Sequence, residues 1–311
     1  MIEVFRNPNY NFIGKRKWAY AISLAVTLLG LVSLGVRGLH YDLDFTGGTL
    51  VQVRFEKPPT VANIRAGLSR IQLGESVIQE FGDPSEYIIR MPLTSTSSEE
   101  LAKKVTGALQ QEKSLGNFEI RRVEFVGPQV GKELQWQAVQ AVLAGLVGIL
   151  LYIALRFDLK GGVAAVIAVF HDVLVCLGAI SITGREFSLP VLAALLTIIG
   201  FSVNDTIVAY DRLRENRAKF VPKGKSFAEQ MNDAVNQTLS RTVLTSLTVF
   251  FSAAILLFFG GKTLEDFAFV LFVGVITGTY STTYVAAALV VDWTEYVDAR
   301  LRRGKKAVAK A

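Results

Sequence analysis

The chain has 311 residues, of which 51% are hydrophobic and only 19% are charged. This balance is unusual for a soluble domain and favours an integral membrane protein. The formal net charge of +6 would suggest nucleic-acid binding in a soluble protein. Here the basic residues cluster beside apolar runs, so membrane topology explains the charge better and no nucleic-acid partner is expected. The single cysteine, Cys176, excludes an internal disulfide and has no metal-site spacing around it.

About six apolar runs approach the roughly 20 residues that a helix needs to cross a bilayer. They cover residues 18–36, 139–155, 162–183, 189–210, 242–260 and 267–291. Basic residues precede the first run, as in a secretory signal. That run nevertheless exceeds the roughly 7–15-residue core of a signal peptide and lacks a clear cleavage site, so we expect a retained span.

The distribution of lysine and arginine predicts the orientation. These residues crowd the N-terminal segment 1–17, the turn 156–160, the loop 211–241 and the C-terminal tail 292–311. The intervening short loops hold only Arg185 and Lys262. The positive-inside rule therefore predicts that both termini are cytoplasmic.

Between the first two spans lies a polar segment, residues 37–135, which this topology places outside the cytoplasm. Alternating or apolar runs predict strands at 50–55, 77–81, 87–90 and 118–125, and helical periodicity predicts helices over 61–71 and 101–109. The resulting βαββαβ order is the ferredoxin-like arrangement. The segment contains no phosphate loop and no catalytic triad, so we expect binding rather than catalysis.

The loop before the fifth span carries a helix start signal. Ser226 and Glu229 have the spacing of a capping box, and apolar residues follow on one face. This pattern predicts a short amphipathic helix on the membrane surface that leads into Arg241.

Asp205 lies within the fourth span, where a carboxylate costs several kcal/mol unless it faces protein, water or an opposite charge. It is four to seven residues from the predicted cytoplasmic end, roughly 6–10 Å inside at 1.5 Å per residue. Arg241 opens the fifth span, so the two groups can meet at a similar depth. Along that span a polar stripe follows one helical face, which must contact protein or water: Arg241, Thr245, Thr248 and Ser252.

Burial raises the pKa of a carboxylate in general, whereas a nearby arginine lowers it. Movement of Arg241 relative to Asp205 would therefore load and release a proton. The hypothesis is that Asp205 carries the proton and Arg241 adjusts its affinity. A static ion pair that only locks the helix packing is the alternative.

Other polar and small residues within the spans have two interpretations each. His171 and Asp172 form either a proton relay or a satisfied structural pair. Asn204 is expected to be a hydrogen-bonding neighbour, because an amide does not titrate in this range. Gly274 and Gly278 have the spacing of a close-packing helix surface.

Several motifs together resemble the SecF family of the bacterial protein-export machinery. The fourth span contains Gly-Phe-Ser-Val-Asn-Asp-Thr-Ile-Val, followed closely by Asp-Arg-Leu-Arg-Glu-Asn; these are residues 200–208 and 211–216. Further matching segments are residues 44–48, 126–131, 171–172, 240–242 and 278–281. The resemblance covers essentially the whole chain in order. Phe201 departs from it, since a tyrosine is common there, but no ionisable position is lost.

The resemblance implies a half of a transporter of the RND type, with about six transmembrane helices and an α+β extracytoplasmic domain. It implies a multi-pass protein of the bacterial cytoplasmic membrane that pairs obligatorily with SecD and works beside the SecY-SecE-SecG channel. YajC and an unfolded preprotein are further implied partners. The implied role is to assist preprotein translocation with the proton motive force, and the implied proton pathway includes Asp205 and Arg241.

Alternative functions stay open at this point. An exporter half for lipids or small hydrophobic molecules would share the architecture, and a passive assembly scaffold of the export channel would need no titrating residue. An intramembrane hydrolase is disfavoured because no nucleophile motif is recognisable. We therefore expect no catalytic residues, no metal and no cofactor. The coupling ion is expected to be a proton, with sodium as the alternative, since a carboxylate serves both.

Overall fold

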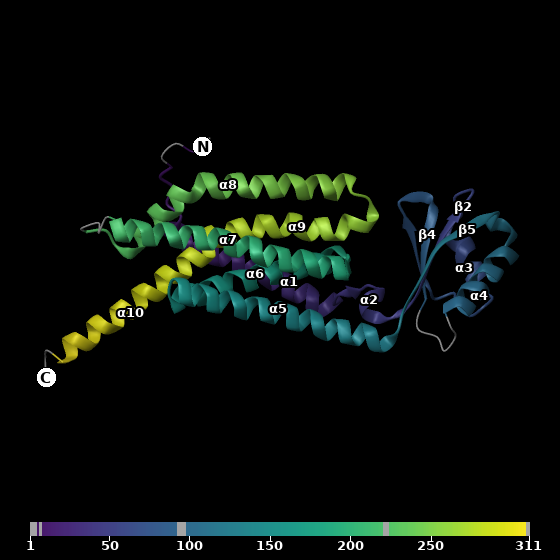
Figure 1. Ribbon diagram of the computed structural model, residues 1–311, viewed down its shortest axis with the longest axis horizontal. Coiled ribbons are helices and arrows are strands. Elements are labelled where there is room, and N and C mark those ends of the chain that lie inside the picture. Colours follow the sequence, from purple (N-terminus) through teal and green to yellow (C-terminus); the bar gives the residue numbers. More distant parts are fainter. Residues whose placement is uncertain (1–4, 6–7, 92–97, 220–223, 309–311) are drawn as a thin grey trace.

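The computed structural model describes residues 5, 8–91, 98–219 and 224–308. Within them, six helical segments are long and apolar enough to cross a membrane. They are built on α1 (Arg16–Arg37), α5 (Pro128–Arg156), α6 (Leu159–Thr183), α7 (Leu189–Lys219), α8 (Phe227–Phe259) and α9 (Lys262–Ser281). These helices run side by side in one bundle, with a small α/β domain at one end (Figure 1). The predicted helical membrane protein with an added α+β domain is confirmed.

The α/β domain forms one four-stranded sheet with two helices. Its elements are β2 (Gly48–Phe55), α3 (Val61–Ser69), β3 (Val77–Phe81), β4 (Asp83–Met91), α4 (Ser98–Gln111) and β5 (Phe118–Val126), with a 3-10 turn η2 (Lys113–Leu115) before β5. The strand order is β3-β4-β2-β5, and every neighbouring pair is antiparallel. Val51 and Val53 of β2 are fully buried against apolar residues of both helices. The ferredoxin-like prediction is confirmed.

The short elements join this domain to the bundle. β1 (His40–Tyr41) pairs in parallel with β6 (Glu186–Phe187), and α2 (Leu43–Thr46) follows β1. Arg90 of β4 forms ion pairs with Glu186 and, at 3.4 Å, with Asp42. The sheet is therefore held by charge to the loop between α6 and α7.

The region before the fifth span differs from the prediction. Ser226 and Glu229 do form a capping box. However, the helix that starts there does not end before the span, because α8 continues without interruption from Phe227 to Phe259. The segment 227–259 contains neither glycine nor proline to break it. The expected surface helix is thus the first part of the spanning helix.

The C-terminal part of the chain is also more helical than expected. A π-helical stretch, η3 (Thr282–Ala286), joins α9 to α10 (Ala287–Val308). The predicted sixth span, 267–291, therefore crosses from α9 into α10, and most of the predicted basic tail is helix. Arg16, which follows the 3-10 turn η1 (Ile13–Lys15), pairs with Asp292 at 2.9 Å and with Glu295 at 3.1 Å. These pairs hold the start of α1 against α10.

Helices α7 and α9 approach closely at glycine. A Cβ atom added to Gly274 would overlap Cγ1 of Ile198, and one added to Gly278 would lie 3.3 Å from Cβ of Ser202. Real Cβ atoms essentially never approach another atom that closely. Helix α9 can therefore pack this tightly against α7 only because residue 274 has no side chain.

We predict that Gly274→Ala destabilises the bundle by about 1–3 kcal/mol, the usual cost of overpacking a filled interface. Gly148→Ala on α5 is the matched control, because a Cβ there meets nothing within 4 Å. Thermal unfolding of the purified protein in detergent measures both. Equal stability of the two variants would contradict the close packing of α7 and α9.

Candidate ion-coupling site

Asp205 lies at the meeting point of α7, α8 and η3. Its side chain is only 3% exposed and faces a cavity with about 10 Å³ of room for the centre of a water molecule. That room is near the lower limit for holding one water. Hydroxyl-bearing residues line much of the cavity: Thr238 and Thr242 of α8, and Thr282 and Thr283 of η3. The carboxylate thus points into a small polar space inside the bundle.

The carboxylate of Asp205 is incompletely satisfied. Its Oδ2 atom is buried and has no hydrogen-bond partner among the residues that the structure describes. A buried, unpartnered carboxylate oxygen is costly in a low-dielectric interior, so such groups are uncommon in native structures. A proton, a water molecule or a cation at this oxygen would remove the deficit.

Arg241 lies beside the cavity rather than in it. It is exposed on the surface of α8 and interacts electrostatically with Asp205. No ion pair within 4 Å joins the two in the part of the chain that the structure describes. Thr242 is rotated by about 100° around the helix from Arg241 and lines the cavity instead.

The polar stripe predicted on the fifth span follows Arg241 and faces away from the rest of this chain. Thr245 is half-buried and Thr248 is exposed, and both hydroxyls donate to carbonyls of their own helix. Ser252 does the same and is exposed. Asn204 of α7 is exposed as well. Polar groups of α7 and α8 are therefore exposed on the surface of the described part of the chain.

Asp172 is the centre of a second, fully buried polar cluster. Its Oδ2 accepts hydrogen bonds from Ser202 of α7 and from Ser281 of α9, both at 2.7 Å. Its Oδ1 lies 3.1 Å from Nδ1 of His171, whose Nε2 is buried without a partner. Through this one side chain α6 is bonded to α7 and to α9.

The π-helical stretch connects the two polar regions. Thr282 donates to the carbonyl oxygen of Ser202 at 3.1 Å, and its hydroxyl lies 3.3 Å from that of Thr206. Thr206 directly follows Asp205 in the sequence. π-Helical turns inside α-helices are frequent at functional sites. Here the turn aims Thr282 and Thr283 at the Asp205 cavity.

Sequence reasoning selected the ionisable residues but missed most of the hydroxyl groups around them. Ser202, Ser281, Thr242, Thr282 and Thr283 were not singled out, although all are buried. The available signal was the concentration of Ser and Thr within apolar spans. Their inward direction depends on the helix rotation and on the π-turn, which the periodicity of one helix does not fix.

We predict that Asp172→Ala destabilises the protein by about 2–4 kcal/mol, because it leaves buried hydroxyl donors of two helices without an acceptor. Thr197→Ala is the control, since the Thr197 hydroxyl donates only to Ala193 of its own helix. Thermal unfolding in detergent is the measurement. A loss no larger than that of the control would mean that Asp172 does not hold the three helices together.

Comparisons with known proteins agree with this architecture. Residues 105–296 match the family described as protein export membrane protein SecD/SecF, C-terminal, and residues 32–59 match the SecD/SecF GG motif. The SecF protein translocase subunit of Desulfurispirillum indicum is 45% identical over 94% of this chain and 94% of its own length. The SecF subunit of Pseudomonas aeruginosa is 41% identical over 90% of each.

A solved structure extends the agreement to three dimensions. The crystal structure of SecDF, a translocon-associated membrane protein from Thermus thermophilus, superposes with a TM-score of 0.80 at 42% identity. The match covers 93% of this chain and 39% of that longer chain. The chain therefore belongs to the SecF family of protein translocase subunits.

Proposed function

We propose that this chain is the SecF subunit that, together with SecD, uses the proton motive force to assist preprotein translocation across the cytoplasmic membrane. Support comes from a relative in Thermus thermophilus that is named as the single protein translocase subunit SecDF. This chain matches 39% of the length of that relative. The partner channel would be SecY-SecE-SecG, with YajC as a further partner. In this proposal the basic ends of the spans face the cytoplasm, and the α/β domain lies outside it.

One observation carries the coupling proposal: the unpartnered oxygen of Asp205 faces a small hydroxyl-lined cavity between three helical segments. Proton binding there removes a buried negative charge, and proton release restores it. Such a change alters how favourably α7, α8 and η3 pack around the cavity. Moving one charge through 100 mV supplies roughly 2.3 kcal/mol, which is enough to bias two conformations that differ by a few kcal/mol.

Arg241 would respond to this change through a small movement of α8. It already attracts Asp205 from outside the cavity, so a rotation or shift of α8 would bring the two charges together. The Thr245 and Thr248 hydroxyls are satisfied within α8, but the exposed side chains of Arg241 and Asn204 would be costly against lipid, which offers no hydrogen bonds. We infer that SecD covers these side chains in the assembled complex.

The His171–Asp172 pair fits polar support better than proton relay. Both oxygens of Asp172 already have partners, and in the part of the chain that the structure describes no hydrogen bond joins this cluster to the carboxylate of Asp205. The pair would hold α6, α7 and α9 fixed while α8 moves. In the same way Gly274 and Gly278 would keep α9 tight against α7.

We predict that Asp205→Asn abolishes proton-dependent stimulation of export while the protein still assembles, because asparagine is similar in size but does not titrate. Asp211→Asn is the matched control on the same helix, since Asp211 is exposed and pairs with Arg156 at 3.2 Å. Precursor export is measured in cells depleted of their own copy, with membrane abundance and SecD association checked.

Normal export by the Asp205→Asn variant would favour the passive scaffold and defeat the coupling proposal. If export by the variant fails, export by the wild-type protein is measured again after sodium in the medium has been replaced, which identifies the coupling ion. A requirement for sodium would show that the site carries that cation instead of a proton.

The α/β domain would transmit force through its charged attachment. Arg90→Met removes the ion pairs to Glu186 and Asp42 but keeps the bulk of the side chain. We predict roughly tenfold faster amide exchange in β1 and β6, with a change of about 1.4 kcal/mol in local opening. Arg121→Met on β5 is the control, because its partner Glu119 lies on the same strand. Unchanged exchange in both variants would mean that Arg90 does not hold the domain.

A further inference from the structure

A second and much larger cavity, of about 370 Å³, opens where α6, α7, α8 and α10 meet. It is separate from the Asp205 cavity, since the two share no lining residue. Its size is within the range of small-molecule sites. The proton-coupling proposal does not use it.

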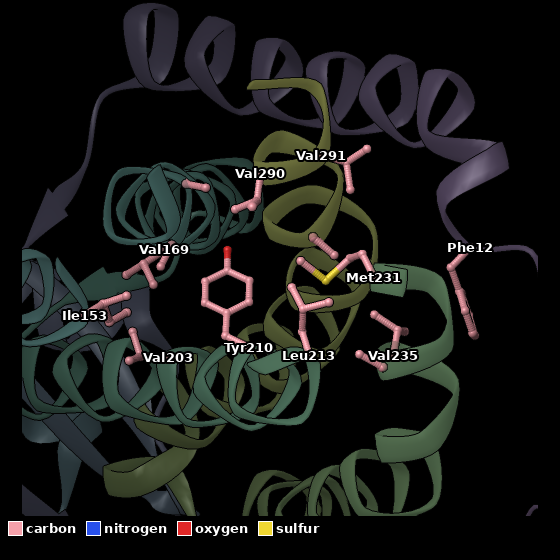
Figure 2. Close-up of a cluster of buried hydrophobic side chains, with 14 of the residues drawn as sticks. Phe12, Ile153, Val169, Val203, Tyr210, Leu213, Met231, Val235, Val290 and Val291 are labelled. Atoms are coloured by element: carbon pink, nitrogen blue, oxygen red, sulfur yellow. The ribbon is translucent and has the colours of Figure 1, made fainter. Parts of the chain in front are cut away.

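One wall of this cavity is apolar. Tyr210 and Leu213 of α7, Met231 of α8 and Val290 of α10 line it, and all belong to the largest buried hydrophobic cluster. Figure 2 shows the Tyr210 ring directed from α7 toward α10, with Leu213 and Met231 beside it. The Tyr210 hydroxyl donates a hydrogen bond to the carbonyl oxygen of Ala286 at 3.3 Å. This wall offers contact to hydrocarbon and little to a polar molecule.

The rim of the cavity is basic. Arg214 donates to the carbonyl oxygen of Arg156 at 3.4 Å, and the Arg217 guanidinium lies 5.5 Å from the centre of the Phe227 ring, which is a cation–π contact. For the residues that the structure describes, neither arginine has an ion pair with a carboxylate. The lining carboxylate, Asp158, accepts the N–H of Gly161 at 2.6 Å as the cap of α6. Two arginine charges thus remain available to an anion.

The cavity lies near the end of the membrane-spanning part of α7. The apolar run on this helix ends near Tyr210 and the helix continues beyond it, so Arg214 and Arg217 lie about one to two turns past the apolar run. Basic residues of the 156–160 turn are close in the fold, as the contact between Arg214 and Arg156 demonstrates. An apolar wall and a basic rim at this depth match an amphiphile with an anionic head. Free phosphate would satisfy the rim and leave the wall empty.

We propose that this cavity binds an anionic glycerophospholipid, with its phosphate between Arg214 and Arg217 and an acyl chain against Tyr210, Leu213 and Met231. Basic pockets between transmembrane helices are suited to such headgroups. Charge complementarity selects the anionic lipid over a zwitterionic one. Bound there, the lipid contacts α6, α7, α8 and α10 together and stabilises their arrangement.

The test uses the full chain purified with its SecD partner. Native mass spectrometry counts bound lipid during titration with dioleoyl-phosphatidylglycerol or, separately, dioleoyl-phosphatidylcholine. Two phosphate-contacting arginines near a membrane surface correspond to roughly 25–30-fold in affinity. We therefore expect the R214Q/R217Q double variant to bind phosphatidylglycerol about 25–30-fold more weakly. The matched control is K17Q/R300Q, which removes two exposed charges outside the cavity.

The proposal would be overturned if the wild-type protein bound the two lipids equally, or if the phosphatidylglycerol affinity of R214Q/R217Q were unchanged. An equal loss of phosphatidylglycerol affinity in the K17Q/R300Q control would overturn it as well. Glycerol phosphate is added as a competitor, because it carries the phosphate of the lipid without the acyl chains. If it displaces the lipid at equal concentration, the site is an anion site and not a lipid site. An A218W variant, which fills the cavity at its rim, should lose binding without losing either arginine.

Discussion

The absence of water inside a bilayer governs this structure, because each polar side chain within the spans must find its partner in protein. Asp172 meets that requirement completely, with Ser202, Ser281 and His171 around it. Asp205 does not, since its Oδ2 has no partner among the described residues. The same type of residue therefore has two different environments within one bundle. One carboxylate is fully hydrogen-bonded between helices, and the other has an electrostatic deficit, which is the basis of the coupling proposal.

In the coupling proposal, this contrast separates helices that stay fixed from a helix that moves. Helices α6, α7 and α9 are bonded through Asp172 and packed at Gly274, whereas α8 contributes Thr238 and Thr242 to the Asp205 cavity. The cavity is thus bounded on one side by a fixed core and on the other by α8. The proposed lipid, in the cavity with Arg214 and Arg217 at its rim, would contact α8 near its N-terminal end. Both sites would then influence where α8 sits relative to α7.

Much of this could be predicted from the sequence, because hydropathy and two-residue alternation are local signals. The six spans and the ferredoxin-like order of the α/β domain were of this kind. The uninterrupted α8 was missed because a capping box marks where a helix begins and says nothing about where it ends. The direction of Thr242 and Thr282 was missed for another reason. It depends on helix rotation and on a π-turn, which only the packing of several helices sets. The cavity behind Arg214 and Arg217 was not predicted, because Met231 and Val290 reach it from segments that are distant in the sequence.

The central claim is that Asp205 exchanges a proton during the working cycle. Infrared difference spectroscopy of the complex with SecD in proteoliposomes, recorded with and without an imposed proton gradient, measures carboxyl protonation directly. The account predicts a protonated-carboxyl band that changes with the gradient, is absent from Asp205→Asn and persists in Asp172→Asn. A band that persists in Asp205→Asn and disappears in Asp172→Asn would contradict it and move the exchanging group to the other buried carboxylate.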